Sequence, residues 1–282
     1  LTDATYPSET FPIVFTGING LSATNTLTVL PAAGVTATVA STILGPVFRM
    51  SNISHIIFDG RQNGSGTPGS LIVNNTSTTS TTFNFDFIDG STDNVVQYCV
   101  MNNSAAATAG SANIRFSTSV TNPSGNSNNL VYGNTLVGGR SGILMSGTAA
   151  NPNDGNVIDR NSISDFGFTG VWLSASTNNT TIHGNDIFNS TPGINVAHSG
   201  INVSGVLGVN EISGNKIFDL QNTSTSTIRG ITMTGGVGSV WNVFNNFFSF
   251  TNNNGTKTSI YAFQNSGTNA IELNFYYNTF RF

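Results

Sequence analysis

The sequence predicts an all-β fold, a right-handed parallel β-helix in which every coil of the solenoid contributes three short strands. Three observations predict this fold. A motif centred on Asn recurs along the chain, apolar residues alternate between the copies of that motif, and no repeat contains a run of ten or more residues with helical periodicity.

The recurring motif consists of an apolar residue, two further residues, Asn, one residue and a second apolar residue. Consecutive copies lie 27, 24, 30, 31 and 32 residues apart. Such repeats are shorter than the roughly 40 residues of a four-stranded propeller blade, and they lack the helices of a helical solenoid. A coil of three parallel strands fits this period. The Asn residues of the copies are Asn134, Asn161, Asn185, Asn215, Asn246 and Asn278.

We expect each of these Asn residues at the bend between the second and third strands of a coil. Asn tolerates unusual backbone dihedral angles better than most residues. Its amide can also hydrogen-bond the same amide one coil away, at a spacing of about 4.8 Å, so that the copies form an internal Asn ladder. An earlier copy of the motif has Cys99 in place of Asn, and the ladder is predicted to end there.

The apolar residues that alternate between the Asn motifs indicate the first strand of each coil, with one buried face. Segments rich in Gly, Asn and Ser separate the strands. The alternating pairs are Ile114 and Phe116, Ile143 and Met145, Val171 and Leu173, Ile201 and Val203, Ile231 and Met233, and Ile260 and Ala262.

We expect one domain over residues 1–282, with seven to ten coils. Residues 91–282 are predicted to form the regular coils with the Asn ladder, and residues 1–90 to form irregular N-terminal coils. Within this N-terminal part, residues 26–39 and 48–58 are predicted as strands. The Gly-, Ser- and Thr-rich residues 61–82 form either a long loop or a polar coil.

The composition points to an exported protein. Only 8% of the residues are charged, against roughly 25% in an average soluble domain. The net charge of −4 comes without a basic stripe, which argues against a nucleic-acid partner. No apolar run reaches the ~18 residues that cross a bilayer, so no membrane insertion is expected. Cys99 is the only cysteine, no cofactor motif occurs, and the start at Leu1 predicts a processed or excised fragment.

These repeats resemble the parallel β-helix repeats of the pectate-lyase-like superfamily. The motif copies within 94–282 carry this resemblance. Residues 11–39 and 56–60 resemble, more narrowly, the Asn-, Gly- and Thr-rich β-helix segments of large secreted surface proteins of Bacteroidota-type bacteria. The resemblance implies an extracellular or cell-surface location on a bacterium. It specifies no activity, because this architecture hosts lyases, hydrolases, adhesins and spacers.

An enzyme of this superfamily would carry acids and a base on the outward faces of its sheets. Asp159 and His183 are expected one coil apart with Arg160 beside them, and they form either a catalytic group or, more commonly, a solvated pair. The polygalacturonase pattern, with its paired Asp residues, is absent. The outward residues of the second strands are Gln97, Tyr132, Asp159, His183, Ser213, Phe244 and Tyr276. Those of the first strands contain no carboxylate and are Arg115, Leu144, Trp172, Asn202, Thr232 and Tyr261.

A second group of carboxylates consists of Asp86, Asp89 and Asp93. We expect these residues in turns, and the alternative is that they share a cation, for which their spacing is loose.

Two non-enzymatic functions remain. Outward aromatic rings at Tyr132, Trp172, Tyr261 and Tyr276 can stack on sugars, which predicts a cell-surface polysaccharide as partner. Residues 274–282 are an apolar strand without a capping helix, which predicts end-to-end assembly of the chain with itself. We therefore expect a non-catalytic extracellular structural or adhesive β-helix, with a polysaccharide-degrading enzyme as the alternative.

Overall fold

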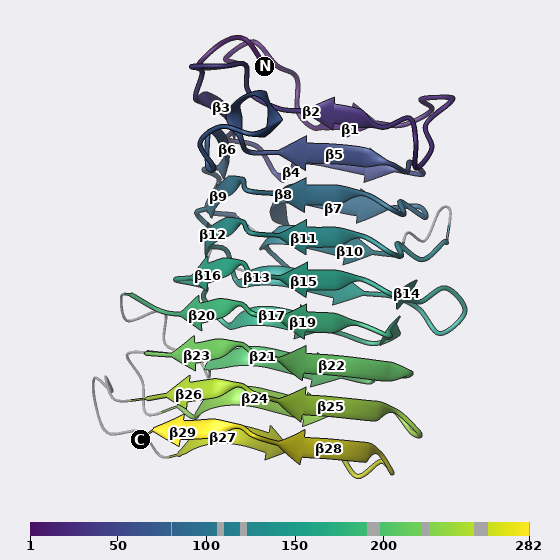
Figure 1. The fold of residues 1–282 in the computed structure, drawn as a ribbon, viewed down its shortest axis with the longest axis vertical. Coiled ribbons are helices and arrows are strands. Elements are labelled where there is room, and N and C mark those ends of the chain that lie inside the picture. Colours follow the sequence, from purple (N-terminus) through teal and green to yellow (C-terminus); the bar gives the residue numbers. More distant parts are fainter. Residues whose placement is uncertain are drawn as a thin grey trace.

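The computed structural model describes residues 1–282 except residue 80, the segments 106–109, 119–122, 191–197, 222–225 and 251–258, and residue 282. The described residues form three parallel sheets of nine strands each, stacked coil upon coil (Figure 1). Their one helical element is a single 3₁₀ turn, η1 (Gln62–Gly64). The predicted parallel β-helix is confirmed, and nine strands per sheet lie within the predicted seven to ten coils.

Each coil contributes one strand to each sheet, in the order sheet 1, sheet 2, sheet 3. Sheet 1 consists of β1 (Ile13–Phe15), β4 (Gly45–Ser51), β7 (Thr82–Ile88), β10 (Ala112–Ser117), β13 (Ser141–Ser146), β17 (Thr169–Leu173), β21 (His198–Ser204), β24 (Ile228–Thr234) and β27 (Ile260–Asn265). Sheet 2 consists of β2 (Leu27–Val29), β5 (Ile56–Asp59), β8 (Val95–Gln97), β11 (Leu130–Tyr132), β15 (Val157–Asp159), β19 (Thr181–His183), β22 (Val209–Ser213), β25 (Val240–Phe244) and β28 (Glu272–Tyr276). Sheet 3 consists of β3 (Ala37–Ser41), β6 (Leu71–Asn75), β9 (Val100–Asn103), β12 (Thr135–Gly138), β16 (Ser162–Ser164), β20 (Asp186–Phe188), β23 (Lys216–Phe218), β26 (Phe247–Ser249) and β29 (Thr279–Arg281). A small two-stranded sheet pairs β14 (Asn153–Asp154) with β18 (Thr177–Asn178).

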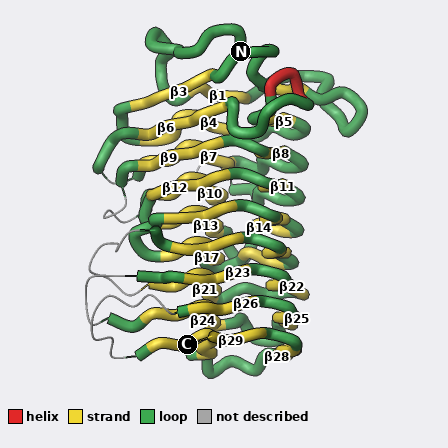
Figure 2. Tube along the Cα trace, turned by 60° about the vertical axis from the view of Figure 1, so that its left-hand side comes forward, coloured by secondary structure: helices red, strands yellow, loops and turns green. Residues whose placement is uncertain are grey.

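Figure 2 shows the strands of successive coils stacked above one another along the solenoid. The core lies between the three sheets, where inward side chains of successive coils stack in columns. Burial of one such aliphatic side chain contributes about 1.5–3 kcal/mol, so the columns account for much of the stability of the solenoid. The central column of sheet 2 is in register through Val96, Val131, Ile158, Ile182, Ile212 and Val243, all at most 1% exposed.

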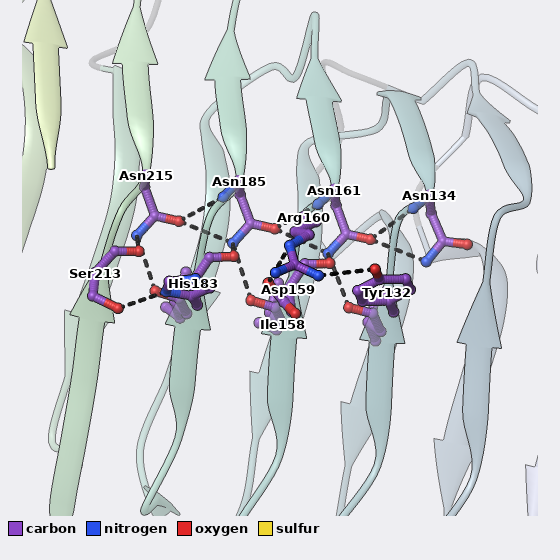
Figure 3. A network of polar contacts seen from close by, with 12 residues as sticks. Tyr132, Asn134, Ile158, Asp159, Arg160, Asn161, His183, Asn185, Ser213 and Asn215 are labelled. Carbon is purple, nitrogen blue, oxygen red and sulfur yellow. Dashed lines mark hydrogen bonds and ion pairs between the residues drawn. The ribbon is translucent and has the colours of Figure 1, made fainter. Parts of the chain in front are cut away.

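The Asn ladder runs inside the bend between sheets 2 and 3. In each rung, Nδ2 of one Asn donates to Oδ1 of the Asn in the next coil, at 2.9–3.0 Å from Asn134 to Asn278. Figure 3 shows the rungs from Asn134 to Asn215. The ladder ends at Cys99, whose backbone N–H donates to Oδ1 of Asn134 at 2.9 Å. Each ladder amide therefore supplies hydrogen-bond partners for polar groups that are buried in the bend.

The backbone of this bend differs from the prediction. The residue that adopts the left-handed conformation is the one before each ladder Asn, for example Gly133 (φ 62°), Arg160 (φ 53°) and Gly184 (φ 66°). The ladder Asn residues do not have positive φ angles. Asn is thus required at these positions for its amide hydrogen bonds and not for its tolerance of unusual dihedral angles.

Two further Asn ladders, which the Asn motif does not predict, line the bend between sheets 1 and 2. Asn94 donates to Asn129 and Asn129 to Asn156, both at 3.1 Å between Nδ2 and Oδ1. Asn126 donates to Asn153 in the same way. The signal was present, because Asn129 and Asn156 lie 27 residues apart, the same distance as Asn134 and Asn161.

The N-terminal coils are more regular than predicted. Residues 26–39 contain two strands, β2 and the start of β3, and residues 48–58 contain parts of β4 and β5. Residues 61–82 include η1 and the whole of β6, so this segment contributes a strand to sheet 3 and is not one long loop.

Candidate functional site

The polar residues of the second strands lie in one outward column of sheet 2, as the sequence predicted. Together with residues of the following bend they form a strip that we call the sheet-2 ridge, defined by Asp59, Arg61, Tyr98, Tyr132, Asp159, Arg160, His183 and Ser213. The column is in register through Asp59, Gln97, Tyr132, Asp159, His183, Ser213, Phe244 and Tyr276.

Two long side chains of the ridge start from left-handed backbone. Tyr98 has φ 55° and Arg160 has φ 53°, at a bend position that holds a left-handed Gly in three other coils. A bulky residue with positive φ is uncommon and costs on the order of 1 kcal/mol or more. A Cβ atom on Gly133 would come within 2.9 Å of Tyr98, and one on Gly184 within 3.3 Å of Arg160. Each side chain therefore lies over a glycine of the following coil.

These side chains form a row in which two aromatic rings lie between two guanidinium groups. The guanidinium carbon of Arg61 lies 4.4 Å from the ring centroid of Tyr98. The rings of Tyr98 and Tyr132 meet edge to face at 5.3 Å. Arg160 lies against the other side of Tyr132, 5.7 Å from its centroid, and its Nη1 donates to the Tyr132 hydroxyl at 3.0 Å (Figure 3). Cation–π and edge-to-face contacts of this kind fix the orientation of the rings.

The charges of the ridge are balanced locally. Arg61 binds Asp59 with a forked pair of hydrogen bonds, the shortest at 2.7 Å. Burial alone would raise the pKa of Asp59. The hydrogen bonds from Arg61 and Gln97 lower the pKa by more than burial raises it, so the pKa of this carboxyl lies below its usual range. Asp159 lies beside Arg160, with 3.9 Å between Oδ1 and Nε. The ridge thus offers fixed donors and acceptors with little net charge.

The hydroxyl of Tyr132 has an altered acidity. The hydrogen bond from Arg160 and the adjacent hydroxyl of Tyr98 lower the pKa of Tyr132. The same contact with Tyr132 raises the pKa of Tyr98. The two phenols therefore act as one pair, with Tyr132 as the stronger acid.

The predicted group of Asp159, His183 and Arg160 is brought together, but the hydrogen bonds do not link Asp159 to His183. Nδ1 of His183 lies 2.8 Å from Oγ of Ser213, and that hydroxyl donates to Glu211 at 2.5 Å. Because the Ser213 hydroxyl donates its hydrogen bond to Glu211, it can only accept from His183, so Nδ1 of His183 carries the proton and donates to Ser213. Ser213 is buried, so it is not an accessible nucleophile.

The three aspartates weighed as cation ligands are not brought together. Asp86 lies within β7, not in a turn, and is paired with two arginines. Asp89 and Asp93 are turn residues with positive φ, as expected. No group of three His, Cys, Asp or Glu side chains that could hold a metal occurs among the described residues. The structure therefore gives no support to a cation site shared by these three residues.

The other predicted stacking residues lie outside the ridge. Tyr276 stacks on Phe244 with 5.1 Å between centroids and is 42% exposed. Trp172 is half-buried on β17. Tyr261 was predicted next to Thr232, but it pairs with Arg229, and Gln264 is the residue next to Thr232. The repeat alignment was three residues out of register there, because Ile260 pairs with Ile228 and not with Ile231.

The outward column of sheet 1 does contain a carboxylate, contrary to the sequence analysis. Asp86 lies in register between Arg49 and Arg115. The column predicted from the sequence begins at Arg115 and leaves Asp86 in a turn, so it does not contain this cluster. The run of alternating residues around Asp86, Phe-Asn-Phe-Asp-Phe, was the available signal for a strand.

Comparisons with known proteins add little to this description. No protein-family model matches the chain, and no curated protein matches its sequence. Among solved structures, the crystal structure of the Dettilon tailspike protein matches with a TM-score of 0.35 and 15% identity. The match covers 84% of this chain and 60% of the tailspike chain, and at this level it carries no inference about function. No helix of the described residues is long and apolar enough to cross a membrane.

Proposed function

We propose that this chain is a non-catalytic adhesive β-helix of the bacterial cell surface, which binds a polysaccharide along the sheet-2 ridge. The observation that carries the proposal is the pair of tyrosine rings, Tyr98 and Tyr132, held between the guanidinium groups of Arg61 and Arg160. The resemblance to Bacteroidota-type surface proteins is in keeping with such a role.

Sugar rings present both apolar C–H faces and hydroxyl groups. Aromatic rings contact the former, and charged or amide groups with planar hydrogen-bonding geometry contact the latter. The ridge supplies both kinds of group on a rigid support, because neighbouring coils are joined by continuous backbone hydrogen bonds. Its balanced charge favours neutral sugars at this site.

The arrangement gives little support to catalysis. A glycosidase needs two carboxyl groups placed across the scissile bond. Here Asp59 is ion-paired with Arg61, and Asp159 lies beside Arg160. Asp59 is also only 3% exposed. Polysaccharide degradation therefore stays the alternative, argued only from the proximity of Asp159 and His183.

The test is binding of the chain to an array of neutral oligosaccharides, followed by calorimetry with the best ligand. Tyr132→Leu should weaken binding at least tenfold, or about 1.4 kcal/mol, and Tyr277→Leu, at an 81% exposed tyrosine outside the ridge, should not. No glycan binding, or equal binding by both variants, would refute the proposal. Release of reducing ends from the ligand would favour the enzymatic alternative.

A second candidate function is end-to-end assembly with another copy of the chain. The last strand of each sheet, β27, β28 or β29, has one unpaired edge in the structure, and Phe275, Tyr276 and Phe280 are 36–43% exposed there. Unpaired edges with apolar side chains favour strand pairing between molecules. Filaments in negative-stain electron microscopy, lost in Phe280→Asp, would support assembly, and monomers at all concentrations would exclude it.

A further inference from the structure

A cluster of three charged residues lies on the outward face of sheet 1, away from the ridge. Arg49 of β4, Asp86 of β7 and Arg115 of β10 occupy the same column in three successive coils. Arg115 donates to both carboxylate oxygens of Asp86, from Nε at 2.7 Å and from Nη2 at 2.9 Å. Nε of Arg49 donates to Oδ2 at 3.2 Å.

The burial of this cluster is uneven. The side chain of Asp86 is 0% exposed, whereas those of Arg49 and Arg115 keep 33% and 25% of their surface in solvent. The guanidinium of Arg115 also packs over the ring of Phe83, 3.9 Å from its centroid. The carboxylate is therefore covered, and the two cations above it are fixed but accessible.

Stability alone does not account for such a cluster. Replacing a buried ion group by apolar residues is often neutral or stabilising, because removing charges from water is costly. The same column continues with Leu144 and Trp172, so the fold accepts apolar residues there. What Asp86 does supply is a fixed orientation for two guanidinium groups.

The cluster also carries an unbalanced charge. Two cations share one carboxylate, for a net charge of +1, whereas Arg61, Arg160 and Lys216 each lie beside a carboxylate of their own. Nη1 of Arg49 and Nη1 of Arg115 have no hydrogen-bond partner among the residues that the structure describes. Guanidinium groups with free N–H donors bind carboxylate and sulfate oxygens well.

We propose that Arg49 and Arg115 form a second binding site, for an anionic substituent of a polysaccharide, a carboxylate or a sulfate ester. Asp86 is a positioning residue that holds both guanidinium groups. That the anion belongs to a glycan rests on the proposed function, but the binding of the anion itself does not. The chain would accordingly bind acidic polysaccharides through sheet 1 and neutral sugar faces through sheet 2.

The experiment is calorimetry of the full chain at low ionic strength with three probes, a polyuronate, a sulfated glycan and neutral dextran. The polyuronate and the sulfated glycan should bind, and dextran should not compete with either of them for the arginine site. Arg49→Gln and Arg115→Gln should each weaken binding of the anionic probe at least tenfold, and Arg281→Gln, at an arginine of β29 far along the solenoid, should leave it unchanged. A carboxylate ligand loses affinity below about pH 4, where it is protonated, and a sulfate ligand does not.

Asp86→Asn separates binding from a purely structural role. It raises the charge of the cluster from +1 to +2 but removes the carboxylate that orients both guanidinium groups. If orientation governs binding, the folded variant should bind the anionic probe less tightly than the unaltered chain, and tighter binding would show that Asp86 is not a positioning residue. Tyr132→Leu should leave this binding intact, which separates a failure of the ridge from a failure of the arginine site. The inference is overturned if neither anionic probe binds, if both Gln variants bind like the unaltered chain, or if a DNA duplex of equal charge binds as tightly.

Discussion

The ring of Tyr98 occupies the space above Gly133, where a Cβ atom would come within 2.9 Å of its Cε1. Both residues belong to the same bend in successive coils, and both have positive φ. Glycine at 133 therefore has two uses: it allows the left-handed backbone, and it leaves room for the ring that lies beside Tyr132. The half-buried aromatic pair of the ridge depends on a residue that contributes no side chain.

Gly133→Ala should displace the ring of Tyr98 and weaken glycan binding by the ridge. The left-handed backbone (φ 62°) adds a cost on the order of 1 kcal/mol for any non-glycine residue. Gly17→Ala is the matched control, because Gly17 has φ 64° and no atom within 4 Å of the added Cβ. Urea unfolding and calorimetry should show similar backbone costs but a loss of binding in Gly133→Ala alone. Equal binding by both variants would show that the position of Tyr98 is unimportant.

Asn185→Leu should destabilise the solenoid by about 2–4 kcal/mol, because it removes a fully buried rung of the ladder. Asn185 donates to Ile158 and to Asn215, and it accepts from Asn161, so Leu leaves several buried groups without partners. Asn274→Leu, on the outward face of β28, should change the free energy of unfolding by roughly 0.5 kcal/mol or less. Urea unfolding measures both. An unchanged stability of Asn185→Leu would mean that the ladder amides contribute nothing net.

The fold could be predicted because the sequence pattern that specifies it repeats once per coil. The spacing of Asn134, Asn161 and Asn185 follows from the length of a coil, and a parallel solenoid brings residues one period apart into register. The same reasoning placed Tyr132, Asp159 and His183 correctly in one column. It failed for Tyr261, where the coil begins differently and a fixed offset from the previous repeat no longer holds.

The details of the site could not be predicted in the same way. Contacts such as Arg61 over Tyr98, or Asp86 between Arg49 and Arg115, depend on the side-chain conformations of residues 29–37 positions apart. The sequence periodicity fixes which residues are neighbours but not which way a long side chain turns. His183 shows this: register places it next to both Asp159 and Ser213, and the structure shows it bonded to Ser213.

The stability that Asp59 contributes should be lost in acid. Its pKa is lower in the folded chain than the ~3.9 of an unfolded one, so the folded state binds fewer protons. The contribution is therefore full above about pH 5 and falls as the pH drops through the folded pKa. The difference in unfolding free energy between the unaltered chain and Asp59→Asn should shrink between pH 5 and pH 3. A constant gap for Asp59→Asn would contradict the prediction.

Tyr132 should lose its proton at a lower pH than an ordinary tyrosine. The hydrogen bond from Arg160 stabilises the phenolate. Arg160→Met removes that donor and should raise the pKa of Tyr132. Absorbance of the phenolate, followed by pH titration of the unaltered chain and of variants with Phe at 132 or 277, assigns each transition. If Tyr132→Phe removes a late transition instead of the earliest one, the hydrogen bond does not form in solution.

Cys99→Asn should extend the ladder by one rung and stabilise the chain. The backbone N–H of Cys99 already donates to Asn134 as a ladder residue would, and its Sγ lies 3.3 Å from the carbonyl oxygen of Gln97. In the equivalent place, Nδ2 of Asn161 donates to the carbonyl oxygen of Asp159 at 3.1 Å.

An amide at position 99 should therefore gain the same bond and a second one to Asn134, with a net gain of about 0.5–1.5 kcal/mol for each hydrogen bond formed. Cys99→Ser, which is smaller and lacks the second donor, is the control and should stabilise less. The thiol of Cys99 is buried, which raises its pKa, so it should react with a thiol reagent only in denaturant. If urea unfolding shows that Cys99→Asn is destabilised relative to Cys99→Ser, the bend at this coil is too narrow for an amide, and the ladder ends at Asn134 for steric reasons.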